Sequence, residues 1–285
     1  MAVGTVGQFG RKLARFFRKV RAAAPDSSPD DIRFVGDYQS WKAATIECCG
    51  YEASHIADRV LQATCGVLRG DFAYERDSVG FTAPDFNWSV LSCLMHAAAA
   101  GRGALSVLDF GGSLGSTFLQ HRKFFEGLTG VDWRVVEQVS FVERGKEILS
   151  KFPRLNGLTF HSSVDAALEA GNVDVLLLGS VLQYLEDPFA ELQSLLGYGF
   201  RWIVLDRTAV LRGDSSGLLT VQHVPATVYE ARYPAWFISH DCLMQQFQES
   251  YELLAEWRCS DSYAVARGKS DFIGCCFRRI AEGGL

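Results

Sequence analysis

Residues 107–115 read VLDFGGSLG, an apolar run that passes through an acid into a glycine-rich turn. The run predicts a buried strand that ends close to Asp109. The glycines at 111, 112 and 115 predict a turn whose backbone approaches a ligand closely. In an open α/β sheet, ligands bind at the carboxyl ends of the strands. This turn is therefore the predicted ligand site, and the chemistry of its ligand decides how the rest of the chain is interpreted.

The turn fits neither common phosphate-binding pattern. Counted from Gly111, the dinucleotide pattern GxGxxG requires glycine at two positions where this chain has Ser113 and Ser116. A P-loop requires GK[ST], and Gly115 is followed by Ser116. Asp109 would also repel a pyrophosphate, whereas an ammonium or a sulfonium suits a carboxylate. S-adenosylmethionine has both of these cations and no phosphate.

Apolar runs alternate with helical patterns after residue 103. The runs are LSVLDF (105–110), WRVVE (133–137), LTFH (158–161), VDVLLLG (173–179) and RWIVLD (201–206). Near-continuous apolar strands separated by helices predict a parallel sheet that is covered on both faces. The chain closes with YELLAEWRCS and DFIGCCFRR, which predict an antiparallel hairpin at the edge of that sheet.

The glycine turn is similar to motif I of class I S-adenosylmethionine-dependent methyltransferases, with Asp109, Gly111 and Gly115 matching and Ser113 replacing the middle glycine. More widely, the chain resembles a little-characterised family of bacterial methyltransferases that is associated with surface-polysaccharide gene clusters. The resemblance covers residues 34–280 and rests on GDYQSW, ERDSVGF, VLDFGGSLGS, VVEQ, SVLQYLEDP, LDRT and YPAWF, in this order. It implies a Rossmann-like α/β sheet, mostly parallel with an antiparallel edge hairpin, behind an N-terminal helical cap.

The resemblance also implies a set of cofactor-binding residues. Glu137 ends the second strand, 22 residues after Gly115, where an acid accepts hydrogen bonds from the ribose hydroxyls; the alternative is a solvated strand-end acid. Ser162 would lie near the adenine, although the neighbouring Ser163 also reads as a helix cap. The full predicted set is Asp109, Gly111, Gly112, Ser113, Gly115, Glu137, Gln138, Ser162, Ser180 and Gln183.

Acceptor residues are sought after the fourth and fifth strands and in residues 208–240, a loop-rich insertion that forms the acceptor pocket in the resembled fold. Asp206, His223 and Tyr184 are the candidate catalytic residues. Arg207, Tyr229, Tyr233 and Trp236 are the candidate substrate-binding residues. The aromatic residues could equally form a small satellite core, and Arg207 could simply pair with Asp206.

Four segments make up the predicted organisation. Residues 1–24 have six bases, no acid and an apolar stripe, which predict a basic amphipathic helix. A linker (25–33), a helical cap (34–102) and a methyltransferase domain (103–285) follow. The basic helix either lies weakly on an anionic membrane or docks on protein. The expected location is the cytoplasm, with peripheral contact at the inner face of the membrane.

Composition excludes several classes of function. The net charge of −5 gives no reason to expect a nucleic-acid partner, and no apolar stretch is long enough to span a membrane. Eight cysteines lack CxxC or zinc-ligand spacing, so free thiols and no metal are expected.

The sequence therefore predicts methyl transfer from S-adenosylmethionine to a small acceptor, a hydroxyl or an amine, which could belong to a glycan intermediate. A non-catalytic cofactor-binding or assembly protein of a glycan pathway is the alternative. An NAD-dependent oxidoreductase ranks third because the dinucleotide pattern fails at two of its glycines.

Overall fold

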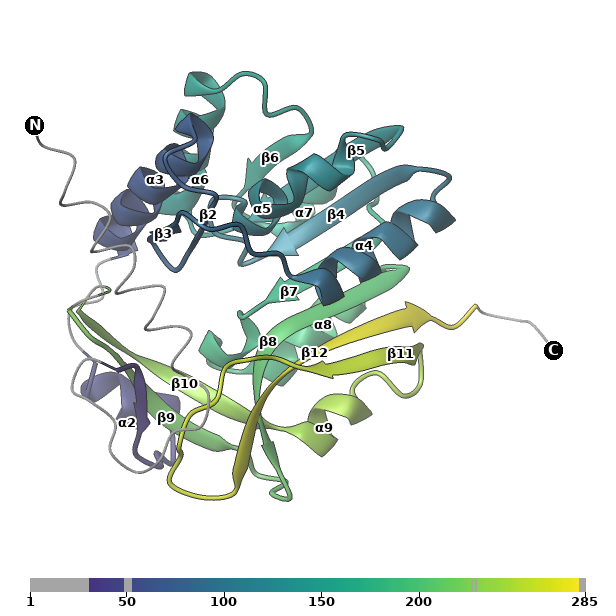
Figure 1. The fold of residues 1–285 in the computed structure, drawn as a ribbon. Coiled ribbons are helices and arrows are strands. Elements are labelled where there is room, and N and C mark those ends of the chain that lie inside the picture. Colours follow the sequence, from purple (N-terminus) through teal and green to yellow (C-terminus); the bar gives the residue numbers. More distant parts are fainter. Residues whose placement is uncertain (1–30, 49–52, 227, 229, 282–285) are drawn as a thin grey trace, which may run out of the picture.

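The structure, a computed structural model, describes residues 31–48, 53–226, 228 and 230–281 (Figure 1). The predicted basic helix at 1–24 lies outside these residues. In the part of the chain that is described, no helix combines the length and apolarity that crossing a membrane requires.

A curved sheet forms the body of the molecule (Figure 1). Five parallel strands run side by side in the order β6-β5-β4-β7-β8, and the antiparallel β12 and then β11 extend the sheet beyond β8. The strands are β4 (Ala104–Phe110), β5 (Gly130–Val136), β6 (Leu158–His161), β7 (Val175–Gly179), β8 (Trp202–Arg212), β11 (Tyr251–Arg258) and β12 (Lys269–Arg279). This arrangement confirms the predicted Rossmann-like sheet with an antiparallel edge hairpin.

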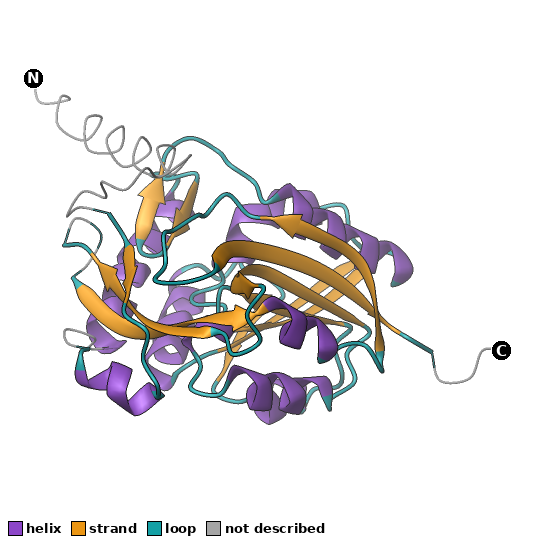
Figure 2. Cartoon of the chain, turned by 90° about the horizontal axis from the view of Figure 1, so that it is seen from below, coloured by secondary structure: helices purple, strands orange, loops and turns teal. Residues whose placement is uncertain are grey.

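Helices cover both faces of the sheet, as Figure 2 shows. Alternate residues of β7 separate the two layers: Leu177 packs in one hydrophobic cluster, while Leu176 and Leu178 pack in the other. The first cluster includes residues of α4 (Trp88–Ala100), α5 (Ser116–Phe125) and α6 (Val139–Lys151). The second includes residues of α7 (Val164–Leu168), α8 (Pro188–Leu196) and α9 (His240–Gln245). The apolar strands are thus buried on both faces.

The predicted loop-rich insertion is wrong, because residues 208–240 are largely strand. β8 continues to Arg212, and β9 (Leu218–Val224) and β10 (Ala231–Ser239) form an antiparallel pair after it. β1 (Arg33–Val35) adds to the outer edge of β9, and the end of β10 runs parallel to the end of β8. Through the β10–β8 pairing these three strands continue the main sheet, and they line the cavity at the carboxyl ends of the parallel strands.

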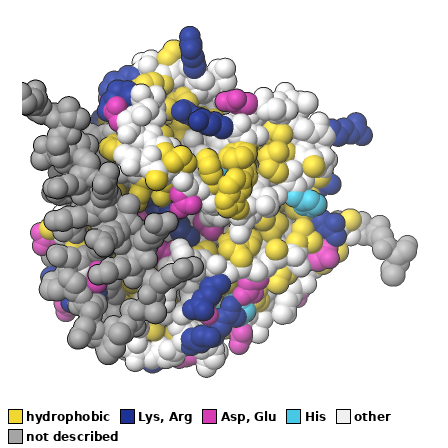
Figure 3. Space-filling view, in the orientation of Figure 1, with side chains coloured by type: hydrophobic (Ala, Val, Ile, Leu, Met, Phe, Trp, Pro, Cys, Tyr) yellow, Lys and Arg dark blue, Asp and Glu magenta, His cyan; other side chains and the backbone are white. Residues whose placement is uncertain are grey.

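The segment before β4 is only partly the predicted helical cap. It contains α2 (Trp41–Ile46) and α3 (Ala53–Arg69), but also a hairpin of β2 (Tyr74–Arg76) and β3 (Val79–Phe81). α4 packs on one face of the main sheet and is not part of a cap, because its buried residues lie in one core cluster with residues of β4 and β8. On the face shown in Figure 3, hydrophobic side chains gather near the middle, with a few acidic side chains beside them.

Candidate active site

One cavity of about 1070 Å³ lies at the carboxyl ends of the parallel strands. Its lining comes from the glycine turn after β4, the ends of β5, β7 and β8, the β2–β3 hairpin, α2, α3 and the β9–β10 pair. Elements that are distant in the sequence therefore converge where ligands bind in an open α/β sheet.

The glycine turn leaves no room for side chains. A Cβ on Gly112 would lie 2.4 Å from Cγ of Asp109, and one on Gly111 would lie 2.5 Å from a methyl group of Val181. Gly111 also has a φ of 70°, in the left-handed region that favours glycine. Ser113, which replaces the expected middle glycine, adopts the same region with a φ of 56°. The turn therefore keeps its shape despite this substitution.

Asp109 lies beneath the turn rather than standing free in the cavity. Its side chain is only 2% exposed, and its Oδ2 accepts a 3.0 Å hydrogen bond from Nε1 of Trp133. Burial raises the pKa of Asp109 to about 7, although the hydrogen bond from Trp133 lowers it in part. The ionised carboxylate is therefore held in a site that disfavours its charge, which makes it receptive to a cation.

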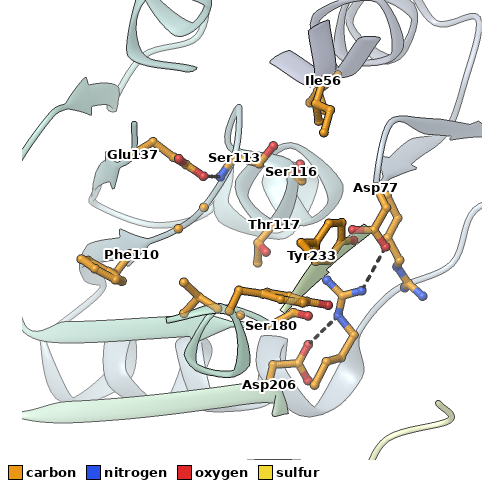
Figure 4. Close-up of a pocket in the computed structure, with 18 of the residues that line it drawn as sticks. Ile56, Asp77, Phe110, Ser113, Ser116, Thr117, Glu137, Ser180, Asp206 and Tyr233 are labelled. Atoms are coloured by element: carbon orange, nitrogen blue, oxygen red, sulfur yellow. Dashed lines mark hydrogen bonds and ion pairs between the residues drawn. The ribbon is translucent and has the colours of Figure 1, made fainter. Parts of the chain in front are cut away.

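Glu137 follows β5 and contacts the turn, as the dashed line in Figure 4 shows. Its Oε1 accepts from the backbone N–H of Ser113 at 3.2 Å, and its Oε2 accepts from that of Gln138 at 2.8 Å. Burial raises its pKa, and these two hydrogen bonds lower it in part. Each oxygen keeps a lone pair for a further donor. The carboxylate thus has the fixed orientation that binding a pair of hydroxyls requires.

The ends of β7 and β8 hold two residues in the left-handed region: Ser180, with a φ of 57°, and Arg207, with a φ of 48°. Strained backbone of this kind persists where the surroundings fix it, and it gathers at functional sites. Gln183 supplies the restraint here, because its Nε2 donates to Oγ of Ser180 at 2.9 Å and to the carbonyl of Arg207 at 3.1 Å. Gln183 is fully buried and does not line the cavity, so it acts by positioning these residues, and its direct contact with a cofactor stays a prediction.

An ion-pair cluster faces the cavity at the end of β8 (Figure 4). Nη1 of Arg207 lies 3.6 Å from Asp77 in the β2–β3 hairpin, and Nε lies 3.8 Å from Asp206. The Asn87 amide donates at 2.9 Å to Oδ2 of Asp206, the same oxygen that lies near Arg207, and so helps to fix that carboxylate. Arg207 thus joins the hairpin to the sheet, and Asp206 keeps a defined position at the end of β8 on the cavity wall.

Asn87 is itself fixed by two further contacts. Its Oδ1 caps α4 through the N–H of Val90 at 3.2 Å, and its own N–H donates to Nε2 of His121 at 3.2 Å. Nδ1 of His121 lies 2.9 Å from the carbonyl of Thr117. His121 is fully buried, and burial lowers its pKa, so a neutral ring that accepts at Nε2 and donates at Nδ1 satisfies both contacts. His121 is therefore a structural support for Asn87.

Two tyrosines line the cavity on the side of β9 and β10. The hydroxyl of Tyr184 donates to Gln222 of β9 at 2.9 Å, and the rings of Tyr184 and Tyr233 meet edge to face, 5.4 Å apart. Burial raises the pKa of Tyr184, so its hydroxyl keeps its proton at neutral pH and is a poor base. Tyr233 also lines the cavity, and its role in binding a substrate stays a prediction.

Several predicted site residues lie elsewhere. His223 does not line the cavity, because its strand neighbours Gln222 and Val224 do and side chains alternate across a strand. Trp236 donates from Nε1 to the carbonyl of Glu186 at 3.4 Å and is also absent from the lining. Gly115 acts at the start of α5, with a φ of 81°. Tyr229 lies outside the described residues.

The remaining predicted residues of the cavity wall are Gln138 and Ser162 on the side of Glu137. The main residue that the sequence did not reveal is Glu75 of β2, which lines the cavity and is only 5% exposed. Its single signal was membership of the ERDSVGF motif.

No family model and no curated protein matches the chain. Among solved structures, it is similar to the N-terminal domain of EvdMO1 in the presence of SAH and D-fucose, with 15% identity over 81% of this chain and 98% of that chain and a TM-score of 0.48. A S-adenosylmethionine-dependent methyltransferase from Clostridium acetobutylicum matches at 7% identity, 66% and 89% coverage and a TM-score of 0.43. The glycopeptide N-methyltransferase MtfA with SAM matches at 11%, 65% and 92%, with a TM-score of 0.42. At these values the likeness carries no argument about function.

Proposed function

We propose that this chain binds S-adenosylmethionine and transfers its methyl group to a hydroxyl or an amine of a small acceptor. The observation that supports this most is the pair of acids at the glycine turn. Asp109 lies buried directly beneath Gly112. Glu137 is fixed beside Ser113, and each of its carboxylate oxygens can accept a further hydrogen bond. A ligand that combines a ribose with positive charge satisfies both acids.

The same pair argues against a dinucleotide. A pyrophosphate over Gly111 and Gly112 would lie against the carboxylate of Asp109, and like charges at short range in a buried site repel strongly. No lysine or arginine lies among the lining residues of the turn itself, which are residues 109–113. An NAD-dependent oxidoreductase is therefore the weaker proposal.

S-adenosylmethionine would supply an activated methyl group on a sulfonium, so positioning of the acceptor dominates the chemistry that the protein must add. Asp206, Arg207 and Tyr233 line the half of the cavity where that acceptor would bind. Asp206 is a stronger candidate than Tyr184 for taking the proton from the methylated group, because Asn87 holds its Oδ2 in place. The acceptor could be a glycan intermediate, and a non-catalytic cofactor-binding protein is the competing proposal. Release of S-adenosylhomocysteine with hydroxyl and amine acceptors separates the two.

Glu137→Ala should weaken binding of S-adenosylmethionine by about 10- to 100-fold, because charged hydrogen bonds to the ribose are worth about 1.5–3 kcal/mol. Titration calorimetry on the full chain measures this directly. Glu143→Ala, an exposed acid on the following helix, is the matched control and should bind as the wild type does. Equal affinity of the two variants would show that Glu137 does not hold the ribose.

A further inference from the structure

Glu75 is a buried acid with an unused oxygen on the wall of the cavity. The Ser116 hydroxyl donates to its Oε1, whereas its Oε2 is buried and has no hydrogen-bond partner among the described residues. Burial raises the pKa of Glu75 to about 7, with a further rise from the Asp77 carboxylate. The Ser116 hydroxyl and the backbone N–H of Ser78 lower it in part. A nearby cation would stabilise the ionised form of such a buried carboxylate strongly.

The hairpin keeps Glu75 from swinging out to solvent. The rings of Tyr74 and Phe81 stack across its two strands, with centroids 4.6 Å apart and planes 6° apart. The turn residues Asp77 and Ser78 both have positive φ, at 51° and 66°, which is the tight two-residue geometry of a type I′ hairpin. The side chain is therefore fixed toward Ser116.

Arg207 does not neutralise Glu75. Its guanidinium is engaged with Asp77 and Asp206, and the charge of Arg207 lowers the pKa of Glu75 only as the weakest of its perturbing influences. Among the groups that face Glu75, Asp77 adds negative charge, whereas the Ser116 hydroxyl and the backbone N–H of Ser78 are neutral donors. No cation of the described residues is paired directly with Glu75, so a ligand cation would meet an uncompensated carboxylate.

The place of Glu75 along the glycine turn indicates which part of a ligand it would meet. Glu137 contacts Ser113 on one side of the turn, whereas Ser116, the partner of Glu75, opens α5 on the other side (Figure 4). The helix cap Gly115 has no side chain, so the first N–H groups of α5 lack a side-chain acceptor and favour an anion. A ligand whose nucleoside is held at Glu137 and which extends along the turn thus ends beside two groups. These are the Glu75 carboxylate, which suits a cation, and the first N–H groups of α5, which suit an anion.

We propose that Glu75 binds the α-ammonium group of the amino-acid end of the cofactor, with the α-carboxylate directed to the first turn of α5. This inference rests on the proposed function, since it assumes that the nucleoside of S-adenosylmethionine lies at Glu137. It assigns the β2–β3 hairpin, which precedes the glycine turn in the chain, to the cofactor site.

Calorimetry with two related ligands tests this assignment on the full chain. S-adenosylhomocysteine has the amino-acid group, and 5′-methylthioadenosine has the same nucleoside and thioether without it. Glu75→Gln keeps the size of the side chain and an oxygen for Ser116. We expect it to weaken S-adenosylhomocysteine by about tenfold or more and to change 5′-methylthioadenosine by less than about twofold. Glu126→Gln, an exposed acid at the far end of α5, is the control and should change neither.

A pH series adds a second readout. The ammonium binds the ionised form of Glu75, so the ratio of the two affinities should rise between about pH 6 and pH 8 in the wild type. The rise should be clearly smaller in Glu75→Gln, where Asp109 still titrates near pH 7. Unchanged S-adenosylhomocysteine affinity in Glu75→Gln, or equal weakening of both ligands, would overturn the assignment. If the wild type binds neither ligand, the proposed function itself fails, which is a distinguishable result.

Discussion

Gly112→Ala should destabilise the folded chain by about 1–3 kcal/mol, the cost of overpacking. It should also reduce the affinity for S-adenosylmethionine by up to about 100-fold, the factor that a misplacement of about 1 Å can cost. The added methyl group would lie 2.4–2.7 Å from the three terminal atoms of the Asp109 side chain. Asp109 cannot retreat, because it is buried and bonded to Trp133. The turn must therefore move, and with it the backbone that contacts the ligand.

Gly127→Ala is the matched control for this substitution. Neither Gly112 nor Gly127 has a positive φ, so alanine suits both backbones, but a Cβ on Gly127 meets nothing within 4 Å. Calorimetry should find wild-type affinity in Gly127→Ala. Wild-type affinity in Gly112→Ala as well would show that the turn does not cradle the ligand.

Asp109→Asn should make the ligand-free protein more stable relative to the wild type at pH 8 than at pH 4. The pKa of Asp109 rises from 3.8 to about 7 on folding, so the folded state disfavours the ionised carboxylate. The wild type therefore loses free energy of unfolding as the pH rises from about 4 to about 7. The loss is up to about 4 kcal/mol, since each unit of pKa corresponds to about 1.36 kcal/mol. Asparagine does not ionise, and its Oδ1 still accepts from Trp133.

Thermal unfolding at the two pH values measures this effect. The asparagine amide adds a buried donor, but its cost is the same at both pH values, so the change in the difference between variant and wild type is the relevant quantity. We expect the melting temperature of Asp109→Asn, relative to wild type, to be several degrees higher at pH 8 than at pH 4. A difference that does not vary with pH would contradict the burial of an ionisable Asp109.

The sheet could be predicted because its strands are apolar on both faces. The runs at 105–110, 158–161 and 173–179 match β4, β6 and β7 within two residues. β9 and β10 were missed because Gln222, Tyr233 and Pro234 interrupt their apolar pattern and resemble loop chemistry. Their polar side chains nevertheless face the cavity, where a ligand would replace water.

Part of the candidate site was predictable from short motifs at strand ends. Asp109 and the glycine turn follow the first strand, and Glu137 ends the second strand at the expected spacing. Glu75 and Asn87 could not be found in this way, because they come from a hairpin and a helix cap that only the tertiary structure brings to the cavity. The Asp77–Ser78 turn also lacks the glycine that signals a type I′ hairpin in a sequence.

Titration of the wild-type chain with S-adenosylmethionine and, separately, with NAD tests the central proposal most directly. The buried acid beneath the glycine turn favours a cationic ligand and disfavours a pyrophosphate. We therefore predict saturable binding of S-adenosylmethionine at one site per chain and no measurable binding of NAD under the same conditions. Tighter binding of NAD than of S-adenosylmethionine would contradict the proposal.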